Sequence, residues 1–251
     1  MTNELPDEIA IVTGAGTGIG AAIAKSLSDH WPVICIGRTL EKLETLASGS
    51  DGRLLPRVLD VTDRATIDSF AGDLVARGTR IVALVNNAGI GRDGSAKLSQ
   101  SELRENWDSV IGTNLTGAFQ LTMALAPLLK RPGGRIVNIA SIAAHNGGRN
   151  KGSTVYAASK AGLNGMTVGL AREFADEGIT VNAIAPGLVL ETEFTARWDP
   201  ERIQIMVDET PVGRAGTPAE IAATTAFLCS PEAGYITGAV IHQNGGTYFG
   251  P

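Results

Sequence analysis

The chain has 251 residues, 43% of them hydrophobic, which is long enough for one well-buried domain. Its formal net charge is -5 without a basic block, which argues against a nucleic-acid partner. The sequence contains no run of eighteen apolar residues, the length needed to cross a membrane. The first ten residues lack the basic region and apolar core of a signal peptide. We therefore expect a cytoplasmic protein with neither a nucleic-acid nor a membrane partner.

Short β-branched runs alternate with longer helical segments along the whole chain. Strands are expected at 9–12, 33–36, 57–61, 81–85, 135–140, 179–185 and 239–243, with helices at 18–29, 39–47, 63–77, 102–130, 155–177 and 217–229. The strands are apolar without strict alternation, as in parallel strands covered on both faces. The series predicts one α/β domain over residues 1–251, a doubly wound Rossmann fold of about seven parallel strands. The weakly periodic segment 187–214 is the candidate substrate lid.

The cysteines and histidines give no sign of a metal centre. Cys35 lies in an apolar strand-like run and Cys229 near the end of a helix-like run, so two buried thiols are favoured over a disulfide. His30, His145 and His242 have no metal-ligand spacing, and we predict no catalytic metal.

A glycine-rich turn, "TGAGTGIG", joins the first strand to the first helix at residues 13–20. That position is where backbone N–H groups and the helix dipole bind a dinucleotide pyrophosphate. Two frames fit: Gly16, Gly18 and Ala21 match G-x-G-x-x-G/A, and Gly14, Gly18 and Gly20 match G-x-x-x-G-x-G. A tight turn without a nucleotide is the alternative.

The ends of the second and third strands bear on the choice of cofactor. An acidic residue about 20 positions beyond the turn would bind the adenosine 2'-hydroxyl, but Gly37 and Arg38 stand there. Arg38 can pair with the 2'-phosphate of NADP(H), or be only a solvated charge at a strand end. Asp60 can accept from an adenine amino group, or Asp60 or Asp63 can cap the next helix.

Tyr156 and Lys160 are the only large polar side chains of the segment "TVYAASKAG", residues 154–162. Spaced four apart, they lie on one face of a helix. A phenol has an unperturbed pKa of about 10, and a nearby ammonium favours the phenolate. The pair therefore suits proton exchange with a carbonyl oxygen while a nicotinamide supplies hydride.

These segments resemble the short-chain dehydrogenase/reductase family over the whole chain. The motifs that carry the resemblance are T-G-A-G-T-G-I-G at 13–20, L-D-V at 59–61, N-N-A-G at 86–89, Asn114 in "GTNLTGAF", Ser141 in "NIASIA", Y-A-A-S-K at 156–160, A-P-G at 185–187 and "ITGAVIHQNGG" at 236–246. The nearest likeness is to 3-oxoacyl-carrier-protein reductases, which implies a homotetramer and NADP(H), with NAD(H) as the alternative.

The resemblance implies a role for each matching residue. Tyr156 is the proton donor or acceptor, and Lys160, Ser141 and Asn114 complete its network. The cofactor site implied by the resemblance, together with the strand-end residues, comprises Gly14, Thr17, Gly18, Ile19, Gly20, Arg38, Asp60, Val61, Asn87, Ala88, Gly89, Tyr156, Lys160, Pro186, Gly187, Val189 and Thr192.

Three features depart from the family pattern. Glu191 stands where a hydroxyl residue usually follows Pro-Gly by four, and Thr192 comes next. The loop after Ser141 is longer than is common, so His145, Asn146 and Asn150 are candidates for substrate contact, with a solvated Gly-rich loop as the alternative. Carrier-protein reductases usually carry a basic residue before G-I-T-V, and this chain has Glu177.

The predicted function is an NADP(H)-dependent oxidoreductase acting on a ketone or secondary alcohol, a 3-oxoacyl group or a small ketone. An acyl carrier protein is a possible partner weakened by Glu177, although Lys130 and Arg131 remain at the other docking position. A sugar or polyol dehydrogenase and a steroid-type dehydrogenase are alternatives. A cofactor sensor without turnover is disfavoured because such proteins typically lose the Tyr or the Lys.

Overall fold

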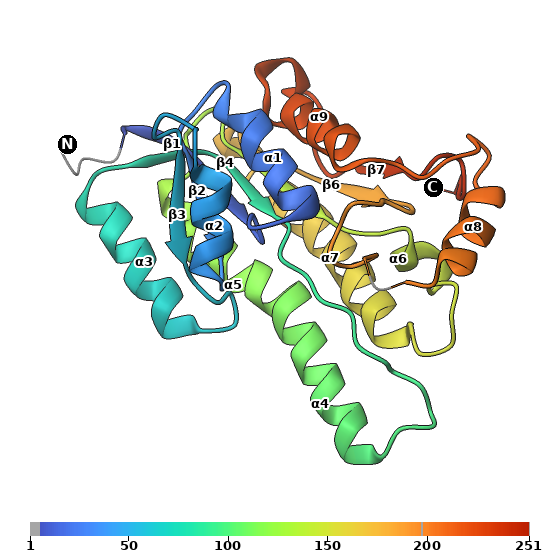
Figure 1. Ribbon diagram of the computed structural model, residues 1–251. Coiled ribbons are helices and arrows are strands. Elements are labelled where there is room, and N and C mark those ends of the chain that lie inside the picture. The colour runs from blue at the N-terminus through green and yellow to red at the C-terminus, as the bar shows by residue number, and fades with distance from the viewer. Residues whose placement is uncertain (1–5, 197, 251) are drawn as a thin grey trace.

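The computed structural model of the protein describes residues 6–196 and 198–250, and its strands form one parallel sheet (Figure 1). The strands are β1 (Glu8–Thr13), β2 (Val33–Gly37), β3 (Leu54–Val58), β4 (Arg80–Asn86), β5 (Arg135–Ile139), β6 (Thr180–Pro186) and β7 (Val240–Gln243). Their order is β3-β2-β1-β4-β5-β6-β7. The chain starts at the centre of the sheet, winds to one edge and returns beside β1, which confirms the predicted doubly wound fold.

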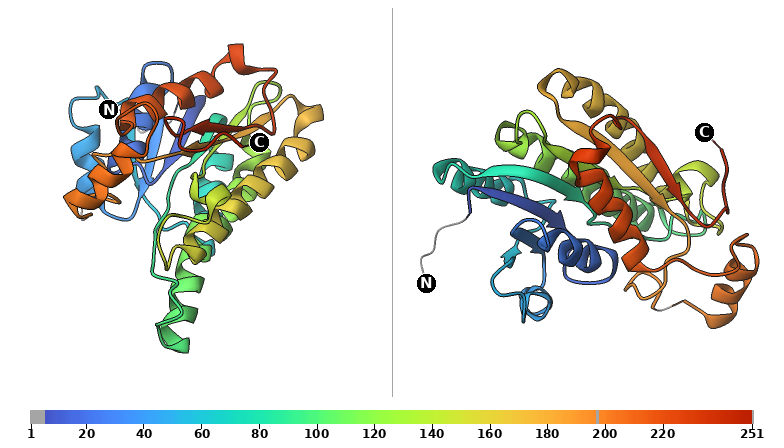
Figure 2. Two further views of the ribbon diagram at one scale, coloured as in Figure 1. Left: turned by 90° about the vertical axis from the view of Figure 1, so that its right-hand side faces the viewer. Right: turned by 90° about the horizontal axis from the view of Figure 1, so that it is seen from above.

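Helices cover both faces of the sheet, as the two views of Figure 2 show. They are α1 (Gly18–Ser28), α2 (Leu40–Ala47), α3 (Arg64–Ala76), α4 (Gln100–Ile111), α5 (Gly117–Leu125), α6 (Ala143–Asn146), α7 (Thr154–Glu173), α8 (Pro200–Asp208) and α9 (Pro218–Cys229). Helices α1, α2 and α9 pack on one face and α3, α5 and α7 on the other, so the sheet separates two buried apolar clusters. Helix α4 extends beyond the body of the sheet (Figure 1).

The third strand lies earlier than the sequence predicts. It spans Leu54–Val58 instead of 57–61, and it includes Pro56. Proline cannot donate to a strand ladder, so it argues against an interior strand. Here β3 is an edge strand paired only with β2, and the missing donor is tolerated. The residues Leu59, Asp60 and Val61 consequently lie beyond the strand, at the carboxyl edge of the sheet.

The helix expected at 102–130 is interrupted. Helix α4 passes into a π-helical turn, Gly112–Thr116, before α5, and a 3₁₀ turn follows at Ala126–Leu128. The π turn carries Asn114, whose side chain is buried. Single π turns inside helices are rare and are frequent at functional sites.

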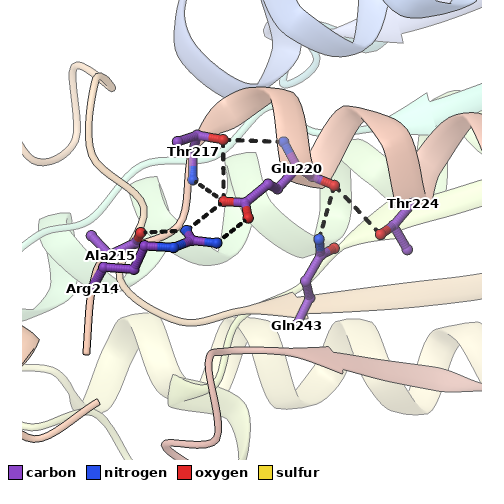
Figure 3. A network of polar contacts seen from close by, with 6 residues as sticks. All are labelled: Arg214, Ala215, Thr217, Glu220, Thr224 and Gln243. Atoms are coloured by element: carbon purple, nitrogen blue, oxygen red, sulfur yellow. Dashed lines mark hydrogen bonds and ion pairs between the residues drawn. The ribbon is translucent and has the colours of Figure 1, made fainter. Parts of the chain in front are cut away.

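The segment 187–214 leaves the sheet after β6 and returns to it before α9. Its two ends meet where the Gly216 amide donates to the Leu188 carbonyl at 2.9 Å and the Leu190 amide donates to the Gly216 carbonyl at 3.2 Å. Just before α9, the Arg214 guanidinium bonds the Glu220 carboxylate at 2.7 and 3.0 Å (Figure 3). The two ends of the segment that carries α8 are therefore held together by hydrogen bonds.

The remaining expectations concern cysteines and membrane segments. Cys35 and Cys229 are both buried and free, as predicted. In the described part of the chain, no helix has the length and apolar character to span a bilayer.

Candidate active site

A cleft of about 940 Å³ runs along the carboxyl ends of the strands. This is the edge at which open parallel sheets bind ligands. Its lining includes each predicted site residue except Asn114: Gly14, Thr17, Gly18, Ile19, Gly20, Arg38, Asp60, Val61, Asn87, Ala88, Gly89, Ser141, Tyr156, Lys160, Pro186, Gly187, Val189 and Thr192. Residues from seven separated segments are thus brought to one cavity.

The glycine-rich turn follows the second of the two predicted frames. Gly14 and Gly18 have φ of 63° and 54°, a region that side chains with a Cβ rarely adopt. A Cβ on Gly20 would lie 2.1 Å from the Gly14 carbonyl oxygen. Thr17, which precedes α1, makes no side-chain capping bond in the described chain, and the first residues of α1, Gly18 to Gly20, line the cleft. This arrangement fits a dinucleotide pyrophosphate.

Thr13 fixes this turn to the end of β4. Its hydroxyl accepts from the amides of Asn87 and Ala88, both at 3.0 Å, and the Asn87 side chain donates to the carbonyls of Thr13 and Gly14 at 2.9 and 3.2 Å. Thr13 was not predicted as a site residue, although it opens the motif. Asn87 consequently positions the turn through its side chain.

Tyr156 and Lys160 lie on successive turns of α7, and both line the cleft. Burial raises the pKa of Tyr156, and a hydrogen bond with the Ser141 side chain acts in the opposite direction. The Lys160 ammonium donates to the Ile139 carbonyl at 2.7 Å, and burial lowers its pKa to about 8. The structure thus brings the phenol, the Ser141 hydroxyl and the ammonium together near the end of β5.

Asn114 lies behind the cleft wall and holds two elements together. Its side-chain nitrogen donates to the Ile90 carbonyl and to the Ser159 hydroxyl, both at 2.9 Å, and its oxygen accepts from the Ile90 amide at 2.8 Å. A Cβ on Gly89 would lie 3.3 Å from Lys160 Nζ and 3.4 Å from Asn114 Oδ1. The π turn therefore brings Asn114 beside Lys160 and fixes the loop after β4.

At one end of the cleft, Arg38 is exposed at the carboxyl end of β2. Asp60 accepts from the amide and the hydroxyl of Thr62 at 2.9 and 2.8 Å, and Asp63 caps α3 instead. Across the mouth, Lys42 of α2 forms an ion pair with Glu193. This pair could not be predicted from the sequence because its members are 151 residues apart along the chain.

The turn after β6 explains why the hydroxyl residue, Thr192, comes one position later than in the family pattern. Glu191 adopts φ of 58°, a left-handed conformation that is uncommon for residues other than glycine. Thr192 lines the cleft, and a Cβ on Gly18 would lie 3.2 Å from the Thr192 Cβ. The turn thus places Thr192 against the glycine-rich turn.

The loop after Ser141 divides between two environments. Asn146 and Asn150 line the cleft, whereas His145 lies outside its described lining. The His145 ring instead contacts the rings of His242 and Tyr248, with centroids 4.6 and 4.9 Å apart, and its Nε2 lies 3.1 Å from Asn164 Nδ2. His145 is therefore placed to hold β7 and the C-terminal segment.

Comparison with known proteins covers nearly the whole chain. Residues 14–248 match a family model described as "Enoyl-(Acyl carrier protein) reductase". The chain is 40% identical over 248 residues to the 3-oxoacyl-[acyl-carrier-protein] reductase of Vibrio harveyi, covering 97% of this chain and 98% of that protein. It is 43% identical over 246 residues to the Escherichia coli (strain K12) protein of the same name, covering 96% and 97%.

A solved structure also matches the whole chain. It is titled a short-chain dehydrogenase/reductase, glucose/ribitol dehydrogenase, from Brucella melitensis, with a TM-score of 0.88, 33% identity and full coverage of both chains. The chain belongs to the short-chain dehydrogenase/reductase family. It is accordingly a nicotinamide-dependent oxidoreductase that acts on CH–OH and C=O groups.

Proposed function

We propose that this protein reduces the ketone of a 3-oxoacyl thioester or of a small 3-oxo compound with NADPH. The observation that carries the proposal is the partly buried phenol of Tyr156, hydrogen-bonded with Ser141 and adjacent to Lys160 within the cleft. The names of the curated relatives support the choice of a 3-oxoacyl group.

In this mechanism the cofactor supplies the hydride when bound. Ser141 donates a hydrogen bond that orients the substrate carbonyl oxygen, and Tyr156 gives that oxygen its proton. Because burial raises the pKa of Tyr156, the phenol keeps its proton at neutral pH, which suits reduction. The Lys160 ammonium stabilises the phenolate that this transfer leaves, and the Ile139 carbonyl holds the ammonium in place.

Arg38 and Gly37 support NADPH over NADH. A guanidinium is a planar, bidentate partner for a phosphate, and the position before it carries no acid that would repel a 2'-phosphate. Arg38 is exposed and lines the cleft next to Gly37. Thr17, inside the glycine-rich turn, adds no second charge. The preference is therefore expected to be moderate.

The substrate is proposed to arrive without an acidic carrier protein. Lys130 forms an ion pair with Glu8 at 3.0 Å, and Arg131 pairs with Glu177. Both basic residues at the expected docking position are thus neutralised by neighbouring carboxylates. A coenzyme A thioester or a free 3-oxo compound suits this surface better.

We also propose that the segment 187–214 is the substrate lid of this single domain.

A further proposal is that the protein forms a homotetramer. Helix α7 exposes Ala161, Gly165, Val168 and Gly169, and added Cβ atoms at the two glycines would meet no neighbour within 4 Å. Such a small-residue surface permits close packing of the same helix from a second copy. Sedimentation that finds a monomer at micromolar concentration would contradict the assembly.

The function is tested by following NADPH absorbance with acetoacetyl-CoA, crotonyl-CoA, a sugar, a polyol and a steroid ketone. Oxidation of NADPH by acetoacetyl-CoA, with little by crotonyl-CoA, is expected. The matching family model is described as an enoyl reductase. Faster turnover of crotonyl-CoA would therefore mean that the enzyme reduces a C=C bond and not a ketone. Activity confined to the sugar, polyol or steroid would instead favour those dehydrogenase classes.

A further inference from the structure

A series of rings leads from the catalytic phenol into the segment 187–214. The Phe194 ring lies 5.4 Å from the Tyr156 ring, and the Trp198 ring lies 5.8 Å from the Phe194 ring. The Arg202 guanidinium carbon then lies 3.9 Å from the centre of the Trp198 ring. All four side chains line the cleft. The series thus ends on a positive charge three contacts away from the phenol.

Arg202 has no polar partner among the residues that the structure describes. Its Nε is buried without a hydrogen bond, and it forms no ion pair within the part of the chain that the structure describes. On the same helix, Asp208 accepts from Gln204 and the neighbouring Glu209 pairs with Arg149, so nearby groups are satisfied elsewhere. A buried guanidinium nitrogen without an acceptor is costly, and a ligand oxygen would remove that cost.

Other cations of the cleft lining also have no carboxylate partner within the described part of the chain. Arg92 and Lys151 line the cleft and form no ion pair among the described residues. The acids of the lining have other partners, because the Asp93 carboxylate accepts from the Ser95 amide at 2.8 Å and Glu193 pairs with Lys42. This excess of cations occurs in a protein whose formal net charge is -5. It favours a negatively charged ligand here.

The cofactor is not the anion that this geometry favours. The pyrophosphate position lies at the glycine-rich turn, where the residue of the segment in contact is Thr192. Arg202 instead connects through rings to Tyr156, and α8 is tied by the Arg149–Glu209 ion pair to the loop after Ser141. The free cation therefore lies on the substrate side.

We propose that Arg202 makes this enzyme select carbonyl substrates that carry an anionic group, a carboxylate or a phosphate, while Phe194 and Trp198 contact the uncharged part of the substrate. The guanidinium binds the anion in the plane of its N–H groups while its face stays on the indole of Trp198. The inference rests on the proposed function and names the substrate class of that same site.

The experiment compares three substrates that share the acetoacetyl group: acetoacetate, acetoacetyl-CoA and neutral ethyl acetoacetate. kcat/KM is measured with NADPH for the wild type, Arg202→Gln and Arg202→Lys. Arg64→Gln is the matched control, because Arg64 is exposed on α3 and pairs with Asp68 at 3.8 Å. Melting temperatures establish that each variant is folded.

Arg202→Gln is expected to lower kcat/KM for the preferred anionic substrate roughly tenfold or more, mainly through KM, and to change ethyl acetoacetate about twofold at most. Arg202→Lys should recover part of the loss, and added salt should weaken the wild-type preference. A loss with acetoacetate assigns the anion to a carboxylate on the substrate itself. A loss with acetoacetyl-CoA alone assigns it to the coenzyme phosphates.

Equal losses with all three substrates would overturn the inference, because Arg202 would then only support Trp198. Unchanged values would overturn it as well. If no substrate is reduced, the proposed function fails, and calorimetry with 3-hydroxybutyrate and 3-hydroxybutyryl-CoA decides the inference separately. Binding weakened about tenfold in Arg202→Gln would support it, and equal binding would refute it.

Discussion

The Lys160 ammonium lies 5.8 Å from the centre of the Tyr156 ring, one turn further along α7. Its position is set from outside the helix, since it donates to the Ile139 carbonyl at the end of β5. The ammonium is thus held by the sheet while the phenol bonds Ser141. In the proposed mechanism, this geometry separates Tyr156, which transfers a proton, from Lys160, which stabilises the resulting charge.

Tyr156→Phe is expected to lower kcat for ketone reduction by at least about a hundredfold, because it removes the proton donor. The cofactor Kd should stay within about threefold, since little contact area is lost. Stopped-flow kinetics and fluorescence titration with NADPH measure the two quantities. A variant that reduces the ketone at a near-normal rate would contradict the mechanism.

The pH profile should report Lys160. Burial lowers the pKa of this ammonium to about 8, so it loses its charge as pH rises through that value. The phenolate formed at Tyr156 then loses its stabilising neighbour, and kcat/KM for reduction should fall above about pH 8 with a single ionisation. Rates measured from pH 6 to 10 with saturating NADPH test this, and a flat profile up to pH 9.5 would refute it.

The sequence predicted the fold and most of the cleft because those signals are local. The alternation of strands and helices, the turn at 13–20 and the four-residue spacing of Tyr156 and Lys160 can each be recognised in a short window. Strand β3 was misplaced because Pro56 is acceptable only at a sheet edge, and edges follow from topology.

Other features depend on contacts between distant segments. The π turn is accompanied by bonds from Asn114 to Ile90 and Ser159, which periodicity does not reveal. The contact between Tyr156 and Phe194 joins α7 to a segment without clear periodicity. Neither could be predicted before the elements were placed in space.

Glu177→Lys should improve the use of a carrier-bound substrate. It removes the carboxylate that pairs with Arg131, while Arg131 keeps its bonds to the carbonyls of Leu129 and Ala126 at 2.7 and 2.8 Å. A more positive surface should raise kcat/KM for an acetoacetyl carrier protein several-fold at low salt, roughly as electrostatic steering does. Acetoacetyl-CoA turnover should not change.

Glu105→Lys, which makes the same charge change on an exposed position of α4, is the control for that comparison. Equal gains in both variants would mean that net charge, rather than the surface around Arg131, governs the rate. No gain in Glu177→Lys would remove this surface as a docking site.

The Glu220 carboxylate, which belongs to the N-terminal cap of α9, should stabilise the fold less as the pH becomes acidic. Bonds from Arg214 and Thr217 lower the pKa of the Glu220 carboxyl to about 2 (Figure 3). A carboxylate whose folded pKa is depressed stabilises the fold above its unfolded pKa of about 4.3 and loses that effect as pH falls toward the folded value. The melting-temperature difference between wild type and Glu220→Gln should therefore shrink from pH 5 to pH 2.5.

Glu105→Gln serves as the comparison for this measurement, because Glu105 is an exposed carboxylate away from the cap. A difference between wild type and Glu220→Gln that stays constant over this pH range would show that the ionised carboxylate adds no stability. The hydrogen bond that the Gln243 side-chain amide donates to the Glu220 backbone carbonyl, 2.8 Å long, is kept in both proteins.

The choice of nicotinamide cofactor should depend on Arg38 and on the absence of an acid at Gly37. Lys42 also lines that end of the cleft, but its pairing with Glu193 neutralises its charge and leaves Arg38 as the main anchor for a 2'-phosphate. A charge-assisted contact contributes about 1.5 to 3 kcal/mol, so the NADPH/NADH ratio of kcat/KM should fall roughly ten- to hundredfold in Gly37→Asp combined with Arg38→Leu. A Cβ at Gly37 would lie 3.2 Å from Leu43 Cδ2, so Arg38→Leu alone is measured as well to separate loss of charge from crowding. A wild type that prefers NADH, or a ratio that neither variant changes, would show that Arg38 is only a surface charge.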